Sequence, residues 1–323
     1  MPIIVYLLLL LVFSFLLIKS TEFLVEALNR LARSSKLGKF ALTSSIIALA
    51  TSLPELFVCL AAALEGQQAL ALGNVIGSNV ANLSLVIGGA TLISGTLPIY
   101  GGFFKKDLIA IFLAALLPLF LLLDGRLSRV DGLLLILVFG VYNYTILAKH
   151  QKQKAKTQTR DFGILRRLNH KGTRRQIAWV FLGAAVLLFS ADMIVKIAVQ
   201  IASGLNLPLI FIGLFLVSAG TSLPELSFEI GAIKKKQIAM VFGDLTGSIV
   251  ANATLVLGLT ALVSPIKIVE VGSIFVATIF FIIIFLLFVF FIRSKRKLER
   301  WEAGVLLLIY ALFIFFEFFI DKV

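Results

Sequence analysis

Charged residues are scarce in this sequence. Asp, Glu, Lys and Arg make up 15% of the 323 residues, whereas hydrophobic residues make up 60%. Soluble domains carry about a quarter charged residues, and a globule of this length has too little interior to bury so much apolar surface. A lipid bilayer supplies the missing apolar surroundings. The composition excludes an ordinary soluble protein and predicts an integral membrane protein.

Cysteine and histidine are nearly absent. Cys59 is the only cysteine, so the chain cannot form an internal disulfide. His150 and His170 both lie in a basic segment, which excludes them as ligands of a membrane-embedded metal. That segment holds a single acid, Asp161, so we do not expect a regulatory calcium-binding loop there. The N-terminal run lacks a basic start and a small-residue cleavage site, so we expect a retained helix and no signal peptide.

Apolar runs long enough to cross a bilayer recur along the chain. They predict helices over 3–27, 40–63, 69–94, 105–123, 130–148, 177–202, 207–232, 237–262, 268–292 and 301–319. The basic stretch 149–176 separates a first unit, 1–148, from a second unit, 177–323. We therefore predict an all-α membrane protein with ten transmembrane helices in two five-helix repeats.

Lys and Arg alternate in frequency between successive loops. The odd-numbered loops hold 24 of these residues, and the even-numbered loops with the C-terminal tail hold 4. Cytoplasmic loops of membrane proteins are rich in Lys and Arg, so we expect cytoplasmic odd loops and both termini outside the cell membrane. The net charge of +13 lies in short clusters between apolar runs, which favours anionic lipid at the loop 149–176 over nucleic acid. We expect a monomer.

Two segments of the chain repeat at an offset of 170 residues. Residues 50–88 and 220–258 are identical at 18 of 39 positions, and both contain Thr-Ser-Leu-Pro-Glu-Leu followed by a Gly-Ser-x-Val-Ala-Asn stretch. The repeated motifs extend over 48–88 and 218–258. Because each unit has an odd number of helices, the second must enter the membrane from the opposite side. Inverted repeats of this kind are typical of secondary transporters, with the ion site at the midplane.

Glu55 and Glu225 occupy equivalent positions within apolar helices. A buried lone carboxylate is costly in a membrane and is usually functional. One glutamate from each repeat gives a pocket of charge −2, which a divalent cation neutralises. Calcium prefers six to eight oxygen ligands, and neighbouring hydroxyls supply some of them: Thr51, Ser52, Thr221 and Ser222.

Prolines and a second pair of helices add further oxygens. Pro54 and Pro224 lack an N–H, so the carbonyls of Ala50 and Gly220 lose their helical partner and become available to a cation. Side chains four residues apart share a helix face, and on the following helices these are Ser78 and Asn82, and Ser248 and Asn252. These four could equally join helices by hydrogen bonds.

These motifs resemble those of the cation/calcium exchanger superfamily, in its sodium/calcium exchanger branch. The resemblance covers nearly the whole chain, and its specificity is concentrated in 48–82 and 218–252. It implies ten helices, with the second, third, seventh and eighth holding the ions and the first and sixth sliding across them. It implies ion contacts from ten side chains and from backbone carbonyls near Ala48 and Ser218. The ten are Thr51, Ser52, Glu55, Ser78, Asn82, Thr221, Ser222, Glu225, Ser248 and Asn252.

The sequence departs from that family at two positions. Many members carry an acid where this chain has Asn252, and Asp244 stands where an amide like Asn74 is expected. Three roles are open for Asp244: an ion contact, a vestibule residue, or an ion-pair partner of Lys234–Lys236. Glu229, the repeat counterpart of Cys59, is expected to pair with Lys234 or to face cytoplasmic water.

Three functions are compatible with these residues. The first is exchange of sodium for calcium by alternating access, with Na⁺ and Ca²⁺ as transported ions and no cofactor. The second is exchange of calcium for protons, or transport of another divalent ion or potassium. The third is an intramembrane aspartyl protease, but Val241 replaces the first glycine of its Gly-x-Gly-Asp motif. Glutamates beside prolines and hydroxyls suit ion ligation better than proteolysis, so we expect a transporter and no enzyme.

Overall fold

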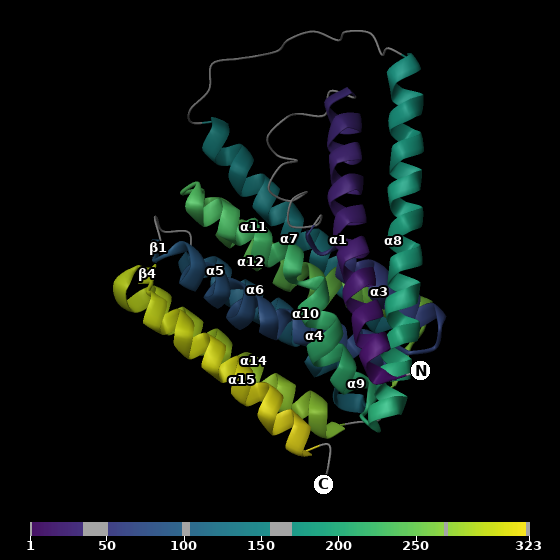
Figure 1. The fold of residues 1–323 in the computed structure, drawn as a ribbon. Helices are drawn as coiled ribbons and strands as arrows, with labels where there is room; N and C mark the ends of the chain where they lie inside the picture. Colours follow the sequence, from purple (N-terminus) through teal and green to yellow (C-terminus); the bar gives the residue numbers. More distant parts are fainter. Residues whose placement is uncertain (1, 35–50, 99–103, 156–169, 268–270, 321–323) are drawn as a thin grey trace.

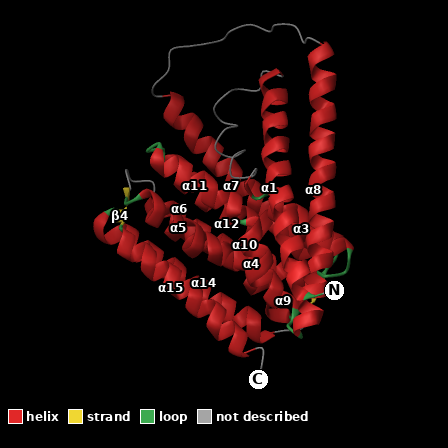
Figure 2. Ribbon diagram, in the orientation of Figure 1, coloured by secondary structure: helices red, strands yellow, loops and turns green. Residues whose placement is uncertain are grey.

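The protein is described by a computed structural model over residues 2–34, 51–98, 104–155, 170–267 and 271–320 (Figure 1). Helices make up almost all of it (Figure 2). Eight of the described helices are long and apolar enough to cross a membrane, and two shorter apolar helices are Leu53–Leu64 and Leu108–Asp124. The predicted all-α membrane fold is confirmed. The count of ten stays a prediction, because 40–50 of the second expected helix lies outside the described residues.

The described residues of the first repeat form five helical regions. Their elements are α1 (Ile3–Ser34), α3 (Leu53–Leu64), α4 (Gln68–Ala81), η1 (Asn82–Val86), α5 (Ile87–Ser94), β1 (Leu97–Pro98), α6 (Phe104–Leu121), η2 (Leu122–Asp124), β2 (Arg126–Leu127) and α7 (Arg129–Ala155). α4, η1 and α5 follow one another without a break. Here η1 is a π-helical turn and η2 a 3₁₀ turn.

The second repeat follows the same order. Its elements are α8 (His170–Leu205), α9 (Leu209–Ile212), η3 (Gly213–Val217), α10 (Ser218–Thr221), α11 (Leu223–Lys234), α12 (Ile238–Val250), η4 (Ala251–Val256), α13 (Leu257–Val263), β3 (Ile266–Lys267), α14 (Val271–Lys295), β4 (Lys297–Leu298) and α15 (Arg300–Ile320). The predicted loop bounds of 149–176 are too wide, because α7 continues to Ala155 and α8 begins at His170. Lys, Arg and Gln are good helix formers, so both helices continue into the basic stretch.

The long helices α1 and α8 lie side by side (Figure 1). Buried apolar residues recur every seven positions on both helices, at Leu10, Leu17 and Leu24 on α1 and at Leu187, Ile194 and Ile201 on α8. This spacing is that of helices crossing at a small angle. Large apolar side chains such as Phe15 and Phe181 are exposed on the outer faces, as expected of helices that face lipid.

Two short antiparallel strand pairs connect the repeats. β1 pairs with β4, and β2 pairs with β3. β1 and β4 follow the third and ninth expected helices and so lie in odd-numbered loops. β2 and β3 follow the fourth and eighth expected helices and so lie in even-numbered loops. Segments that pair must lie on the same side of a membrane. The pairing therefore agrees with an odd number of crossings in each repeat and with inversion of the second repeat.

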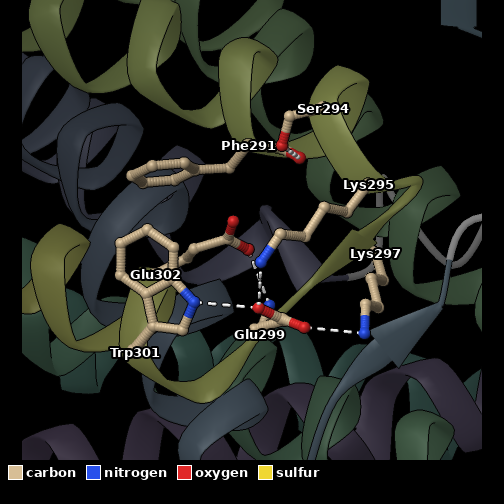
Figure 3. Close-up of polar contacts among 7 residues, drawn as sticks. All are labelled: Phe291, Ser294, Lys295, Lys297, Glu299, Trp301 and Glu302. Atoms are coloured by element: carbon tan, nitrogen blue, oxygen red, sulfur yellow. Dashed lines mark hydrogen bonds and ion pairs between the residues drawn. The ribbon is translucent and has the colours of Figure 1, made fainter.

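At the start of the last helix of each repeat, a carboxylate accepts a hydrogen bond from the backbone N–H three residues before it. Ser128 N–H donates to Asp131 Oδ2 at 2.8 Å before α7, and Glu299 N–H donates to Glu302 Oε2 at 2.8 Å before α15. Figure 3 shows the second turn, where the Glu299 carboxylate accepts from Lys295 Nζ, Lys297 Nζ and Trp301 Nε1. These donors hold the turn between α14 and α15 in one geometry.

Close backbone contact joins the two repeats at the centre. A Cβ atom at Gly73 would overlap the carbonyl oxygen of Ile210, and one at Gly77 would overlap that of Leu214. Only glycine permits α4 to approach α9 and η3 so closely. This contact places the polar face of α4 against the second repeat.

Candidate ion-binding site

The seventh expected helix is broken at the repeated Thr-Ser-Leu-Pro-Glu motif. α10 ends at Thr221 and α11 begins at Leu223, with Ser222 between them at φ −87° and ψ 4°. Ser52 has nearly the same conformation before α3, at φ −81° and ψ 4°. Pro54 and Pro224 stand in the first turn of the restarted helices, where a missing N–H is tolerated. Each glutamate therefore lies in the first turn of a helix within the fold.

Only some of the backbone carbonyls predicted as ion contacts lie in the part of the chain that the structure describes. Ala48 and Ala50 lie outside the described residues. The Ser218 carbonyl accepts from Ser222 N–H at 3.0 Å and from Thr221 Oγ1 at 3.2 Å. A carbonyl has two lone pairs, so an ion at Ser218 would have to displace one of these bonds.

Hydroxyl groups connect each motif to the opposite repeat. Thr51 Oγ1 lies 3.2 Å from Ser248 Oγ, and Thr221 Oγ1 lies 3.5 Å from Ser78 Oγ. These two contacts are equivalent under the offset of 170 residues. The second and eighth helices are thus paired, as are the third and seventh, and the predicted threonine and serine positions come together at the interface of the repeats.

Many oxygen atoms at this interface are buried without a hydrogen bond to any described residue. They are both carboxylate oxygens of Glu55 and of Glu225, the side-chain oxygens of Asn82 and Asn252, and the hydroxyls of Ser52 and Ser222. All six side chains are at most 3% exposed. Leaving so many buried polar atoms without a partner is costly, and a cation would satisfy them together.

Glu55 and Glu225 come from opposite repeats and lie close enough for their charges to interact. The hydroxyls of Thr221 and Ser222 also approach the Glu55 carboxyl group. Among the described residues, no three acidic, cysteine or histidine side chains converge on one point. The arrangement is two carboxylates among neutral oxygens, which is a donor set suited to a hard cation such as calcium or sodium.

The two asparagines lie at π-helical turns, which the sequence analysis did not predict. Asn82 begins η1, and Asn252 is the second residue of η4. π-turns occur often at functional sites, since they free backbone groups and turn side chains out of the regular helix register.

Two further acids enter the same region. Asp244 is 1% exposed, and its Oδ1 accepts from Thr51 Oγ1 at 2.7 Å. The expectation that Glu229 pairs with Lys234 or faces water is wrong, because Glu229 is 0% exposed and neither of its oxygens bonds a described residue. Five residues along a helix correspond to a rotation of about 140°, so Lys234 lies on another face of α11.

An inverted repeat of membrane helices, with buried carboxylates facing across its centre, defines a secondary transporter of cations. Residues 5–148 and 175–319 match the sodium/calcium exchanger protein family. The chain belongs to this family, and cation exchange is its activity; like its relatives it is a transporter and no enzyme.

Relatives and solved structures agree with this assignment. The chain is 30% identical to the inner membrane protein YrbG of Escherichia coli over 80% of this chain and 79% of YrbG. It is 27% identical to the sodium/calcium exchanger MaX1 of Methanosarcina acetivorans over 94% of this chain and 96% of MaX1. The solved sodium-calcium exchanger NCX_Mj superposes with a TM-score of 0.60 at 26% identity, covering 96% of each chain.

Proposed function

We propose that this protein exchanges sodium for calcium, with the ions held between Glu55 and Glu225. The observation that carries the proposal is this pair of buried carboxylates, one from each inverted repeat, with oxygens that no described group satisfies. A single Ca²⁺ ion or several Na⁺ ions neutralise the pair. Because the site crosses the barrier only when neutralised, the two fluxes are coupled.

The ligands we propose are the ten side chains expected from the repeated motifs. Glu55, Glu225, Asn82, Asn252, Ser52 and Ser222 offer unsatisfied oxygens. Thr51, Thr221, Ser78 and Ser248 meet pairwise beside them. Asp244 is not one of these ten; it accepts a hydrogen bond from Thr51, and its Oδ2 is also unsatisfied by described residues.

Alternating access requires elements that move relative to this centre. α1 and α8 contact one another along their lengths and contact the core through α3, α9 and α10. We propose that this pair of helices slides across the core, with the basic loops in the cytoplasm, both termini outside and the basic stretch 149–176 near anionic lipid. The protein needs no cofactor for this cycle, and we propose that it acts as a monomer.

The competing proposal is calcium/proton exchange, or coupling to potassium or another divalent ion. Asn252 favours it, because it leaves one carboxylate fewer at a position where many family members carry an acid. Calcium flux into vesicles containing the purified protein discriminates the two. Uptake driven by an outward sodium gradient, and absent with a pH gradient alone, supports sodium exchange. Uptake driven only by the pH gradient contradicts it.

A further inference from the structure

Helices α11 and α12 form a hairpin that carries two acids at the same level. Lys236 lies in the turn that joins the two helices. Glu229 lies seven residues before it on α11, and Asp244 lies eight residues after it on α12. Their carboxyl groups are close enough for their charges to interact. Neither carboxylate is among the ten ligands described above.

The first repeat contains a neutral version of the same pair. Cys59 and Asn74 stand at the positions equivalent to Glu229 and Asp244, and Asn74 Nδ2 donates to Cys59 Sγ at 3.4 Å. Thr221 donates to Asn74 Oδ1 at 3.3 Å, just as Thr51 donates to Asp244 Oδ1 at 2.7 Å. The fold therefore places the two side chains of each pair in contact range, and in the second repeat both are acids.

Both oxygens of Glu229 and Oδ2 of Asp244 lack a hydrogen-bond partner among the described residues. Glu229 is 0% exposed and Asp244 is 1% exposed, and no ion pair to either acid occurs in the described part of the chain. Two buried carboxylates left unpaired would cost several kcal/mol. A bound positive charge lowers that cost.

The four central acids lie near one another, since the Glu225 carboxyl group is close enough to those of Glu55, Asp244 and Glu229 for their charges to interact. No three of them converge on one metal position among the described residues, and one Ca²⁺ ion at Glu55 and Glu225 leaves the second pair uncompensated. Glu229 and Asp244 offer at most four carboxylate oxygens, and with the Thr51 hydroxyl the set falls short of the six to eight that calcium takes. This favours a monovalent ion.

We propose that Glu229, Asp244 and Thr51 form a second cation site that binds sodium, beside the proposed calcium site and toward the α11–α12 turn. The proposal rests on the sodium/calcium exchange proposed above. In this proposal the carboxylate pair on the α11–α12 hairpin binds sodium. The pair replaces the acid that many family members carry at the position of Asn252. Sodium bound there competes with calcium through the shared Thr51–Ser248 contact.

The test is the displacement of radioactive Ca²⁺ by Na⁺ from the purified full-length protein. The variant is the double substitution Glu229→Cys with Asp244→Asn, which installs the pair already present in the first repeat and so fits the fold. Glu22→Gln is the matched control, because Glu22 is exposed and pairs with Lys19 on α1. Thermal unfolding without added cations checks that each variant is folded.

We expect the double variant to bind as much calcium as the wild type in sodium-free buffer. Displacement should need more sodium and show a lower Hill coefficient, since one sodium ion fewer takes part, while Glu22→Gln matches the wild type. An unchanged sodium dependence in the double variant overturns the proposal, as does a loss of calcium capacity, which would assign the pair to calcium. A wild type that binds no sodium-displaceable calcium instead refutes the proposed exchange function.

Discussion

Thr51 Oγ1 donates a 2.7 Å hydrogen bond to Asp244 Oδ1, which connects the first repeat to the second at the candidate ion site. Its counterpart, Thr221, donates at 3.3 Å to the neutral amide oxygen of Asn74. The two contacts are equivalent in position and differ in acceptor, which is a carboxyl group in one and an amide in the other. Hydrogen bonds to ionised groups are shorter and roughly twice as strong as neutral ones, so the two threonines are not interchangeable.

The first prediction concerns this difference. Thr51→Val leaves a buried carboxylate with one donor fewer and should lower the free energy of unfolding by about 1.5–3 kcal/mol, whereas Thr221→Val should lower it by about 0.5–1.5 kcal/mol. Thermal unfolding in detergent without calcium or sodium measures both variants side by side. Equal losses in the two variants would show that Asp244 is not charged in that contact.

The second prediction concerns the close approach of α4 to the second repeat. Gly77→Ala places a methyl group against the Leu214 backbone carbonyl, which cannot move away as a flexible side chain would. We expect a loss of about 3 kcal/mol or more, or no folded protein. Gly140→Ala is the control, because Gly140 is exposed on α7 with open space around it among the described residues. That variant should be slightly stabilised by the higher helix propensity of alanine.

Size-exclusion chromatography of the detergent-solubilised variants, followed by thermal unfolding, measures this pair. A Gly77→Ala protein as stable as the wild type would mean that the two repeats do not touch at this glycine.

The third prediction concerns the α14–α15 turn in Figure 3. Hydrogen bonds from Lys295, Lys297 and Trp301 lower the pKa of Glu299 from 4.5 to about 2. Because the folded pKa is below the ordinary one, these contacts stabilise the turn above about pH 4.5, and their contribution is lost as the pH falls toward 2. The turn should therefore keep its geometry through mildly acidic conditions.

Trp301 fluorescence reports this titration, since its indole N–H donates to Glu299 at 2.8 Å. In a Trp179→Phe background Trp301 is the remaining tryptophan, and its emission should change with a midpoint well below pH 4.5. Adding Glu299→Gln should abolish that change. A midpoint near 4.5 would contradict the contacts drawn in Figure 3.

Much of the candidate site could be predicted from the sequence because the motif occurs twice. Duplication of Thr-Ser-Leu-Pro-Glu at a fixed offset identified Glu55 and Glu225 without any structure. An odd number of apolar runs in each unit then predicted inversion. Both signals are local or periodic, so they can be detected in the sequence without knowledge of how the helices pack.

Other features depend on tertiary contacts and could not be predicted in the same way. Glu229 lies near three lysines in the sequence, which is typical of a solvated helix end, yet the helix rotation turns it inward toward Asp244. The signal that could have found it was the Cys59–Asn74 equivalence. The π-turns at Asn82 and Asn252 have no composition that distinguishes them from ordinary helix, and the basic ends of α7 and α8 were predicted as loop because charge outweighed helix propensity.

The most direct test of the account is sodium-driven calcium uptake into vesicles containing Glu55→Gln or Glu225→Gln, compared with Glu22→Gln and the wild type. Each amide keeps the size of the side chain and removes one of the two charges that a calcium ion would neutralise. We predict that both central variants lose uptake by at least about a hundredfold, equivalent to some 2.7 kcal/mol, while Glu22→Gln transports like the wild type. Sodium-driven calcium uptake retained by both central variants would contradict the paired-glutamate site.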